Sequence, residues 1–183
     1  MNNEKNSSKP ATTDMKFLSK CIRMQLFSKE NLGITDKQIV QMYEKGKKLY
    51  DAGKYKDAET VFSTLLVVDK KNPAYLYGLA SCAMMLKNDL IAVDSFLKYA
   101  NFVPSDPMPH FYISRIYEKK NDLASTLIAL EMAINSAGNQ PQYQAVKNRA
   151  QMSVATISKV LAEKEKADKA TKNSKVEGTI SSL

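Results

Sequence analysis

The sequence predicts an all-α protein in which three helical hairpins follow one another and form a concave solenoid. Pro73, Pro107 and Pro141 recur at one fixed interval. That interval, about 34 residues, is the length of one repeated helix-turn-helix unit. The chain has six Gly and six Pro among 183 residues, so a turn-rich β architecture is disfavoured. One domain of ordinary size is expected from this length.

Other residues repeat at the same interval and have a mechanical role in such hairpins. Small residues recur where two helices would cross, at Gly46, Ala80 and Ser114, and at Ala58 and Ala92. Large apolar residues follow the crossing positions, at Phe62, Phe96 and Leu130. Small side chains let two helix backbones approach closely, and proline is tolerated where a helix begins. Each hairpin therefore buries its apolar face by stacking on its neighbours.

The elements before the repeats are a polar N-terminus and an amphipathic helix. Residues 1–14 are polar and are predicted to be disordered, and residues 15–38 form an amphipathic helix with a lead-in. Its apolar side consists of Phe17, Leu18, Cys21, Ile22 and Leu26. Packing back on the repeats and dimerisation with a second copy are equally favoured uses of this side.

The three repeats are placed at residues 39–72, 73–106 and 107–140, within the region 39–140, and their pattern is that of tetratricopeptide repeats (TPRs). Gly53 supplies the permissive backbone of the first turn, whereas Lys87 and Asn121 stand at the later turns. A capping helix is predicted over 141–164, with its apolar stripe at Tyr143, Val146, Ala150, Val154, Ile157 and Leu161. Residues 165–183 are charged and polar and are predicted to be disordered.

Composition and motifs exclude several classes of function. The formal charge of +8 is spread along the chain, which disfavours nucleic-acid binding, and no apolar run reaches the roughly 18 residues of a membrane span. Cys21 and Cys82 match no metal or disulfide spacing and are read as free thiols in a reducing cytosol. His110, the only histidine, is expected to be a partly buried packing residue. No catalytic set, metal or cofactor is expected, so the chain is not predicted to be an enzyme.

A peptide-binding groove is the functional surface that this pattern predicts. In stacked helix pairs the first helix of each hairpin lines the inner face, and aromatic and Met side chains there suit an extended apolar peptide. The groove residues are Val40, Tyr43, Lys47, Tyr50, Tyr77, Ser81, Met84, Met85, Met108, Phe111, Tyr112 and Arg115. Any one of them can instead belong to the interhelical core.

Two neighbouring segments carry a family resemblance, the lead-in KENLGITDKQIVQMYEKGKKLYDAGKYKDAETVF and the following LLVVDKKNPAYLYGLASC. They resemble the class II chaperones of bacterial type III secretion systems. The resemblance covers about residues 15–163 and is most specific over 50–82. It implies a bacterial cytoplasmic protein that binds extended segments of two hydrophobic translocators and dimerises through its N-terminal helix. Some members also bind a transcriptional activator. Family members are commonly acidic, and this chain is basic.

Two other functions remain open at this point. A generic TPR scaffold, or assembly factor, would bind folded protein partners, for example on its convex side. A helical repeat associated with RNA or DNA would bind in a manner that collapses with added salt. Insertion of the chain into a membrane is not expected.

Overall fold

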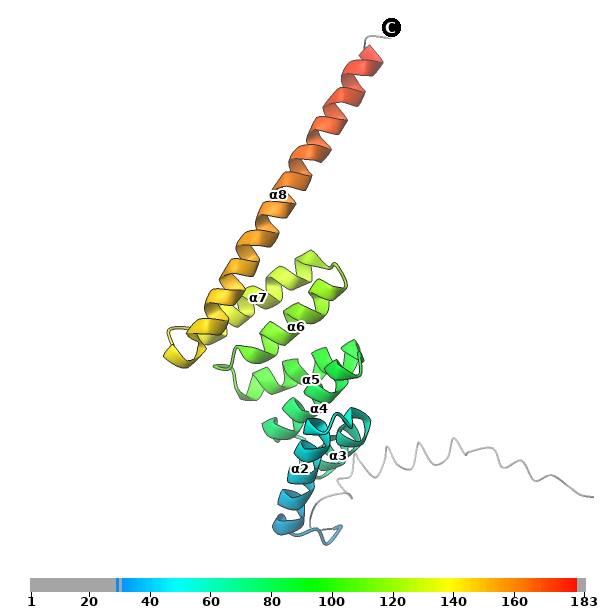
Figure 1. Cartoon of the computed structure of the whole chain (residues 1–183), viewed down its shortest axis with the longest axis vertical. Coiled ribbons are helices and arrows are strands. Elements are labelled where there is room, and N and C mark those ends of the chain that lie inside the picture. The colour runs from blue at the N-terminus through cyan, green and yellow to red at the C-terminus, as the bar shows by residue number, and fades with distance from the viewer. Residues whose placement is uncertain (1–28, 30, 181–183) are drawn as a thin grey trace, which may run out of the picture. The chain divides into compact units, whose positions relative to one another are not determined.

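The computed structural model describes residues 29 and 31–180, and every regular element within them is a helix (Figure 1). The prediction of an all-α chain is thus confirmed. The chain divides into two compact units, Met1–Cys82 and Ala83–Leu183. We call them the first unit and the second unit. The predicted N-terminal helix, with Phe17, Leu18, Cys21, Ile22 and Leu26, lies outside the described residues.

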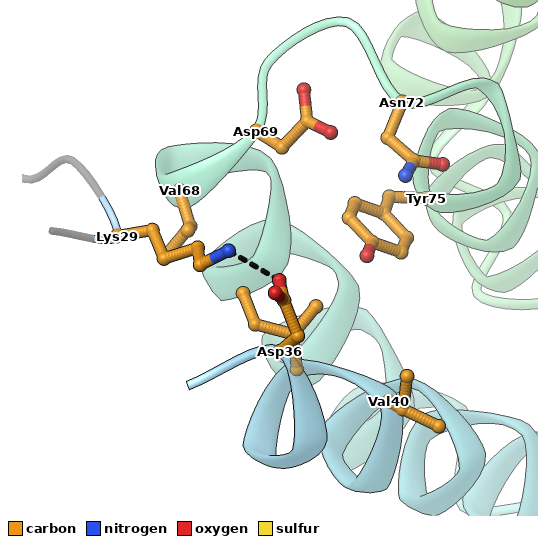
Figure 2. A pocket seen from close by; sticks show the side chains of 8 residues that line it. Lys29, Asp36, Val40, Val68, Asp69, Asn72 and Tyr75 are labelled. Carbon is orange, nitrogen blue, oxygen red and sulfur yellow. Dashed lines mark hydrogen bonds and ion pairs between the residues drawn. The ribbon is translucent and has the colours of Figure 1, made fainter. Parts of the chain in front are cut away.

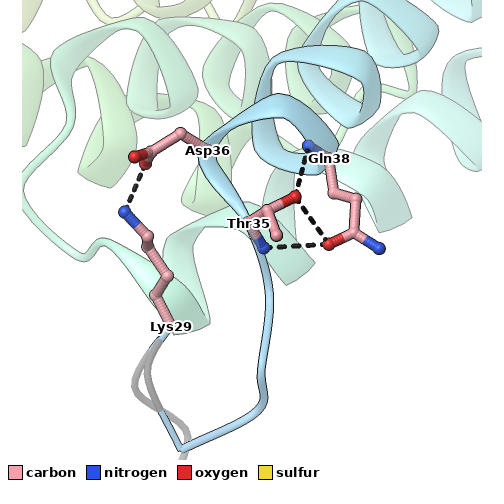
Figure 3. A network of polar contacts seen from close by, with 4 residues as sticks. All are labelled: Lys29, Thr35, Asp36 and Gln38. Atoms are coloured by element: carbon pink, nitrogen blue, oxygen red, sulfur yellow. Dashed lines mark hydrogen bonds and ion pairs between the residues drawn. The ribbon is translucent and has the colours of Figure 1, made fainter.

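The first unit contains α2 (Asp36–Asp51), α3 (Tyr55–Val68) and α4 (Pro73–Met85) up to Cys82. Helix α2 begins with a capping box, in which Gln38 N–H donates to Thr35 Oγ1 at 3.3 Å and Thr35 N–H donates to Gln38 Oε1 at 2.8 Å. Asp36, in the first turn, pairs with Lys29 from the preceding segment (Figure 3). These contacts satisfy amide groups that have no partner inside the helix and place a carboxylate at its positive end.

The core of the first unit is built around the ring of Phe62, which is 2% exposed. A Cβ atom on Gly46 of α2 would lie 3.0 Å from this ring, and one on Gly78 of α4 only 2.6 Å from it. Two glycines therefore provide the space that the ring occupies. Ala58 and Leu65, also on α3, are fully buried in the same cluster. The small residue expected at position 46 is thus explained by direct contact with Phe62.

The second unit contains the end of α4, then α5 (Asp89–Phe102), α6 (Met108–Lys119), α7 (Leu123–Ala137), a short 3-10 helix η1 (Pro141–Tyr143) and α8 (Gln144–Ile180). Ala83 at the end of α4 forms a buried cluster with Ala92 of α5 and Ile116 of α6. Helices α6 and α7 make a hairpin, and α8 packs against α7. A second cluster joins these three helices through Phe111 of α6, Leu130 and Ala133 of α7, and Ala150 of α8.

The turns within the hairpins share one backbone conformation. Gly53, Lys87 and Asn121, which follow one another at the repeat interval, have φ angles of 74°, 59° and 58°. Only the first of them is glycine, so the left-handed conformation is kept where the sequence shows no glycine to predict it. The helices that follow two of these turns are capped by Asn88 and Asp122, whose side chains accept from backbone N–H groups of Ile91 and Ser125.

Helix α8 differs from the prediction at its C-terminal end. Val146, Val154 and Ile157 pack against the α6/α7 cluster. The helix continues to Ile180, however, past residue 164 and through most of the segment predicted to be disordered. Ala, Lys and Glu are frequent in this segment and have high helix propensity, which the prediction from tertiary burial left out. No helix among the described residues is long and apolar enough to cross a membrane.

Candidate peptide-binding surface

The predicted groove residues of α2 lie on one face of that helix. Val40, Tyr43, Lys47 and Tyr50 are spaced by three or four residues, and this spacing aligns side chains along a helix. Val40 is 60% exposed, Lys47 is also exposed, and the two tyrosines are half-buried. The first unit thus presents an aromatic and apolar stripe that is partly accessible to solvent.

Tyr43 belongs both to this stripe and to the core of the first unit. Its ring meets Phe62 edge-on, with centroids 6.0 Å apart, and lies 5.7 Å from the ring of Tyr75. The Lys47 ammonium lies 5.7 Å from the Tyr43 centroid and 3.4 Å from a carboxylate oxygen of Glu44. Tyr43 is therefore a rigid anchor, with an orientation set by the core and a cation beside its ring.

The remaining groove residues of the first unit come from the end of α2 and from α4. Tyr50 contacts the ring of Tyr55 at the start of α3, with centroids 5.2 Å apart. Tyr77 and Ser81 of α4 are half-buried and lie one turn apart. Each of these side chains keeps part of its surface open to solvent.

A pocket of about 460 Å³ opens beside Val40, between the start of α2, the end of α3 and the start of α4 (Figure 2). It is lined by Lys29, Asp36, Ile39, Val40, Val68, Asp69, Asn72 and Tyr75. Ile39, Val40 and Val68 are apolar, whereas carboxylate, amide and phenol groups provide the polar lining. This combination suits an apolar side chain whose adjoining peptide groups need hydrogen-bond partners.

Local hydrogen bonds hold the polar lining of this pocket in place. Asp69 accepts from the backbone N–H of Lys71 at 3.2 Å, and Asn72 accepts from that of Ala74 at 3.0 Å. Burial, with the nearby Asp69 carboxylate, raises the pKa of Tyr75, so its hydroxyl stays protonated. Sequence reasoning found only Val40 of this pocket, because the other residues are brought together from separate elements by the fold.

In the second unit the structure separates the predicted groove residues into exposed and buried ones. Met84 and Met85 end α4, and Met85 is exposed. On α6, Met108 is half-buried, and Arg115 is exposed and donates to Glu118 at 2.5 Å. Tyr112 is half-buried, and its ring stacks on Phe96 of α5 with centroids 5.4 Å apart.

Phe111 corrects the prediction of an open groove residue. Its side chain is 8% exposed and lies in the cluster with Leu130, Ala133 and Ala150. The physical reason is the capping helix α8, which covers this position as a further repeat would. Arg149 of α8 lies over the Phe111 ring, 5.6 Å from its centroid. Arg149 was missed from sequence, although it stands one repeat interval after Arg115 and the period could have identified it.

The buried titratable groups of the described residues are unsuited to catalysis. Burial raises the pKa of the Cys82 thiol to about 11, which keeps it protonated and unreactive. His110 is buried in α6 with no hydrogen-bond partner for Nδ1, and burial lowers its pKa. Within the part of the chain that the structure describes, no three His, Cys, Asp or Glu side chains group to hold a metal ion.

Comparison with known proteins finds similar sequences and similar solved structures. No family model matches the sequence. Low calcium response locus protein H of Yersinia pseudotuberculosis is 25% identical over 116 residues, covering 63% of this chain and 69% of the relative. The type III secretion chaperone SycD of Yersinia enterocolitica, solved with a peptide of the translocator YopD, has a TM-score of 0.64 at 25% identity, covering 68% of this chain and 95% of SycD.

A further structure of SycD, described as a type III secretion translocator chaperone in an alternative dimer, is similar to the same extent. Its TM-score is 0.63 at 25% identity, and the match covers 68% of this chain and 95% of SycD. The likeness therefore extends over nearly the whole of the solved chaperone. About a third of the present chain lies outside the match.

Proposed function

On the resemblance to type III secretion translocator chaperones, confirmed in sequence and in fold, we propose that this chain binds and protects hydrophobic translocators. It acts in the bacterial cytoplasm, as a binding protein and not as an enzyme. The observation that supports this proposal most is the partly exposed stripe of Val40, Tyr43, Lys47 and Tyr50 on a repeat helix. An extended client segment would lie along this stripe.

The surface explains how such a client would be kept soluble. Rigid aromatic rings and adaptable Met side chains give a large apolar contact area at low cost in side-chain entropy. The pocket beside Val40 would take one apolar side chain of the client, with the polar lining facing its backbone. A short bound segment masks part of the client and leaves the remainder unfolded for export. Two translocators are expected as clients, and a transcriptional activator stays a prediction.

The test is recovery of native partners from the source bacterium with tagged protein. Wild-type chain should recover a large secreted protein that has predicted membrane helices. Val40→Asp is the variant that tests the groove most directly. This side chain is mostly exposed, so a charge there opposes apolar binding without disturbing the core. A Tyr43→Ala/Tyr77→Ala double variant should also lose the client, at about 1 to 3 kcal/mol for each truncation.

Thermal unfolding controls for misfolding of these variants, since Tyr43 also packs on Phe62 and Tyr75. If folded Val40→Asp and Tyr variants recovered the same secreted protein in normal amount, the assignment of the groove would be wrong. Recovery of folded, soluble partners by all of them would favour a scaffold instead.

A scaffold that binds folded proteins is the second candidate, and one observation favours it. Leu90 of α5 is 82% exposed, and Ile128 of α7 is 60% exposed. Both lie on the second helix of a hairpin, away from the predicted groove. A Leu90→Ser/Ile128→Ser variant that loses its partners, beside a Val40→Asp variant that keeps them, would establish this alternative.

Dimerisation through residues 15–26 is also part of the proposal, although these residues lie outside the described region. Light scattering should give twice the monomer mass for the full chain and the monomer mass for a Leu18→Asp/Ile22→Asp variant. A monomeric wild-type chain at high concentration would leave packing on its own repeats as the use of this apolar side.

A further inference from the structure

We infer that the face formed by α6 and α8 in the second unit binds carboxylate side chains within an otherwise apolar client segment. Two guanidinium groups, Arg115 and Arg149, would hold the carboxylate beside the Phe111 ring. This inference rests on the proposed function and adds the chemistry of one position in the client. It gives the basic character of the chain a specific use.

Arg149 is the better-placed of the two cations. Its guanidinium carbon lies 5.6 Å from the centroid of the Phe111 ring, within the range of a cation–π contact. The ring itself is fixed by its burial against α7 and α8. Stacking on a fixed ring orients the planar guanidinium while its N–H groups stay available at the edges. Arg149 is exposed and forms no ion pair with a carboxylate of the described residues.

Arg115 adds a second cation on the same face of α6. It follows Phe111 by one helical turn, so both side chains lie along one side of the helix. One of its nitrogen atoms, Nη1, donates to Glu118 at 2.5 Å, and both partners are about half exposed. An exposed pair of this kind contributes little to stability, and the guanidinium has further donors. A client carboxylate can therefore share or replace the contact with Glu118.

Two Met side chains stand within one helical turn of Phe111 or Arg149 on the same helices. Met108 precedes Phe111 by three residues on α6 and is half-buried, and Met152 follows Arg149 by three residues on α8 and is 72% exposed. The face thus combines thioether groups with two positive charges. An acidic residue flanked by apolar ones is the segment that such a surface complements.

The repeat supports the functional reading of these cations. Arg149 stands one repeat interval after Arg115, and Arg115 stands two intervals after Lys47. Ser81 occupies the remaining station. In the first unit Lys47 lies over Tyr43 at 5.7 Å, just as Arg149 lies over an aromatic ring in the second. Each unit thus has a cation beside an aromatic ring, within α2 in the first unit and between α8 and α6 in the second.

The experiment uses peptides amidated at the C-terminus that tile the translocators of the source bacterium. Binding to the full chain is measured by fluorescence anisotropy, and the tightest peptide containing Asp or Glu is resynthesised with Asn or Gln in its place. The acidic peptide should bind wild type about tenfold more tightly than the neutral one. Arg149→Gln should bind the two equally, and Arg149→Lys should restore part of the difference.

Lys159→Gln is the matched control, because Lys159 is an exposed cation on the same helix, about three turns beyond Arg149. It should keep the full preference for the acidic peptide. Equal binding of acidic and neutral peptides by wild type, or an equal loss of both in Arg149→Gln, would overturn the inference. Binding of a peptide synthesised with a free C-terminus, but not of its amidated form, would also overturn it, since the carboxylate would then come from a chain end.

The outcomes separate this inference from the proposed function. In one outcome, Val40→Asp abolishes peptide binding while the Arg variants keep the preference for the acidic peptide. This result would support the groove and contradict the carboxylate site. If no translocator peptide binds the folded wild-type chain, both the proposed function and the carboxylate site are wrong. Thermal unfolding of each variant shows that a lost preference is not a lost fold.

Discussion

At the scale of single residues, Gly78 leaves less room for a Cβ atom than any other described glycine of the first unit. A Cβ atom there would lie 2.6 Å from the ring of Phe62, which is buried and has no room to move aside. We expect Gly78→Ala to lower the free energy of unfolding by about 1 to 3 kcal/mol through overpacking. Urea unfolding followed by circular dichroism measures this loss.

Two variants decide whether the clash is the cause. Ser81→Ala, on the same helix and half-buried, should leave the unfolding midpoint nearly unchanged. Adding Phe62→Leu to Gly78→Ala should cost less than the sum of the two single losses, because the smaller side chain relieves the clash. Additive losses would show that Gly78 matters for a different reason.

His110 gives the second unit a dependence on pH. Burial lowers its pKa below the ordinary value of 6.5, and Asp106 opposes this shift only in part. Between the two pKa values the unfolded chain binds more protons than the folded chain, so stability is present above pH 6.5 and is lost as pH falls. His110→Leu should flatten the difference in unfolding free energy between about pH 7.5 and pH 5.5. An unchanged difference would assign the effect to other groups.

At the scale of elements, the backbone conformation of the turns predicts how glycine substitutions there change stability. Lys87 has a φ angle of 59°, a left-handed conformation that costs a side-chain-bearing residue about 1 kcal/mol. Lys87→Gly should therefore raise the unfolding midpoint, and Gly53→Ala, at φ 74°, should lower it. Asn121→Gly should have a smaller effect, because Asn tolerates this region better than Lys. A lower midpoint for Lys87→Gly would mean that its side chain stabilises the turn.

At the scale of the whole molecule, the long helix α8 has a packed part and an extended part. The residues that pack against α6 and α7 are Val146, Ala150, Val154 and Ile157. A chain ending at residue 164 should keep its melting temperature and its client binding, while its total helicity falls. A chain ending at residue 143 should unfold, because Phe111 and Leu130 lose their cover. If the chain that ends at residue 164 lost client binding, part of the binding surface would lie beyond residue 164.

Much of the candidate surface followed from the repeat alone. The repeat interval identifies which residues share a position in each hairpin, so the alignment of Val40, Tyr43, Lys47 and Tyr50 on α2 was predictable. The same interval leads from Arg115 to Arg149, so the period also identifies this cation. The boundaries of the three repeats and the membership of the groove stay predictions, supported by the helices that the structure places within them.

The sequence by itself determined the helical class, the hairpin period and the small residues at helix crossings, because these depend on local propensity and on spacing along the chain. Only the tertiary structure decided which first-helix positions remain open. Phe111 and Tyr43 have equivalent places in the repeat, yet α8 buries the first, while the second keeps part of its surface exposed beside Lys47. The pocket beside Val40 also depends on the tertiary structure, because residues from three helical elements line it. Exposure depends on which helix packs over a position, and the spacing of residues along the sequence does not identify that helix.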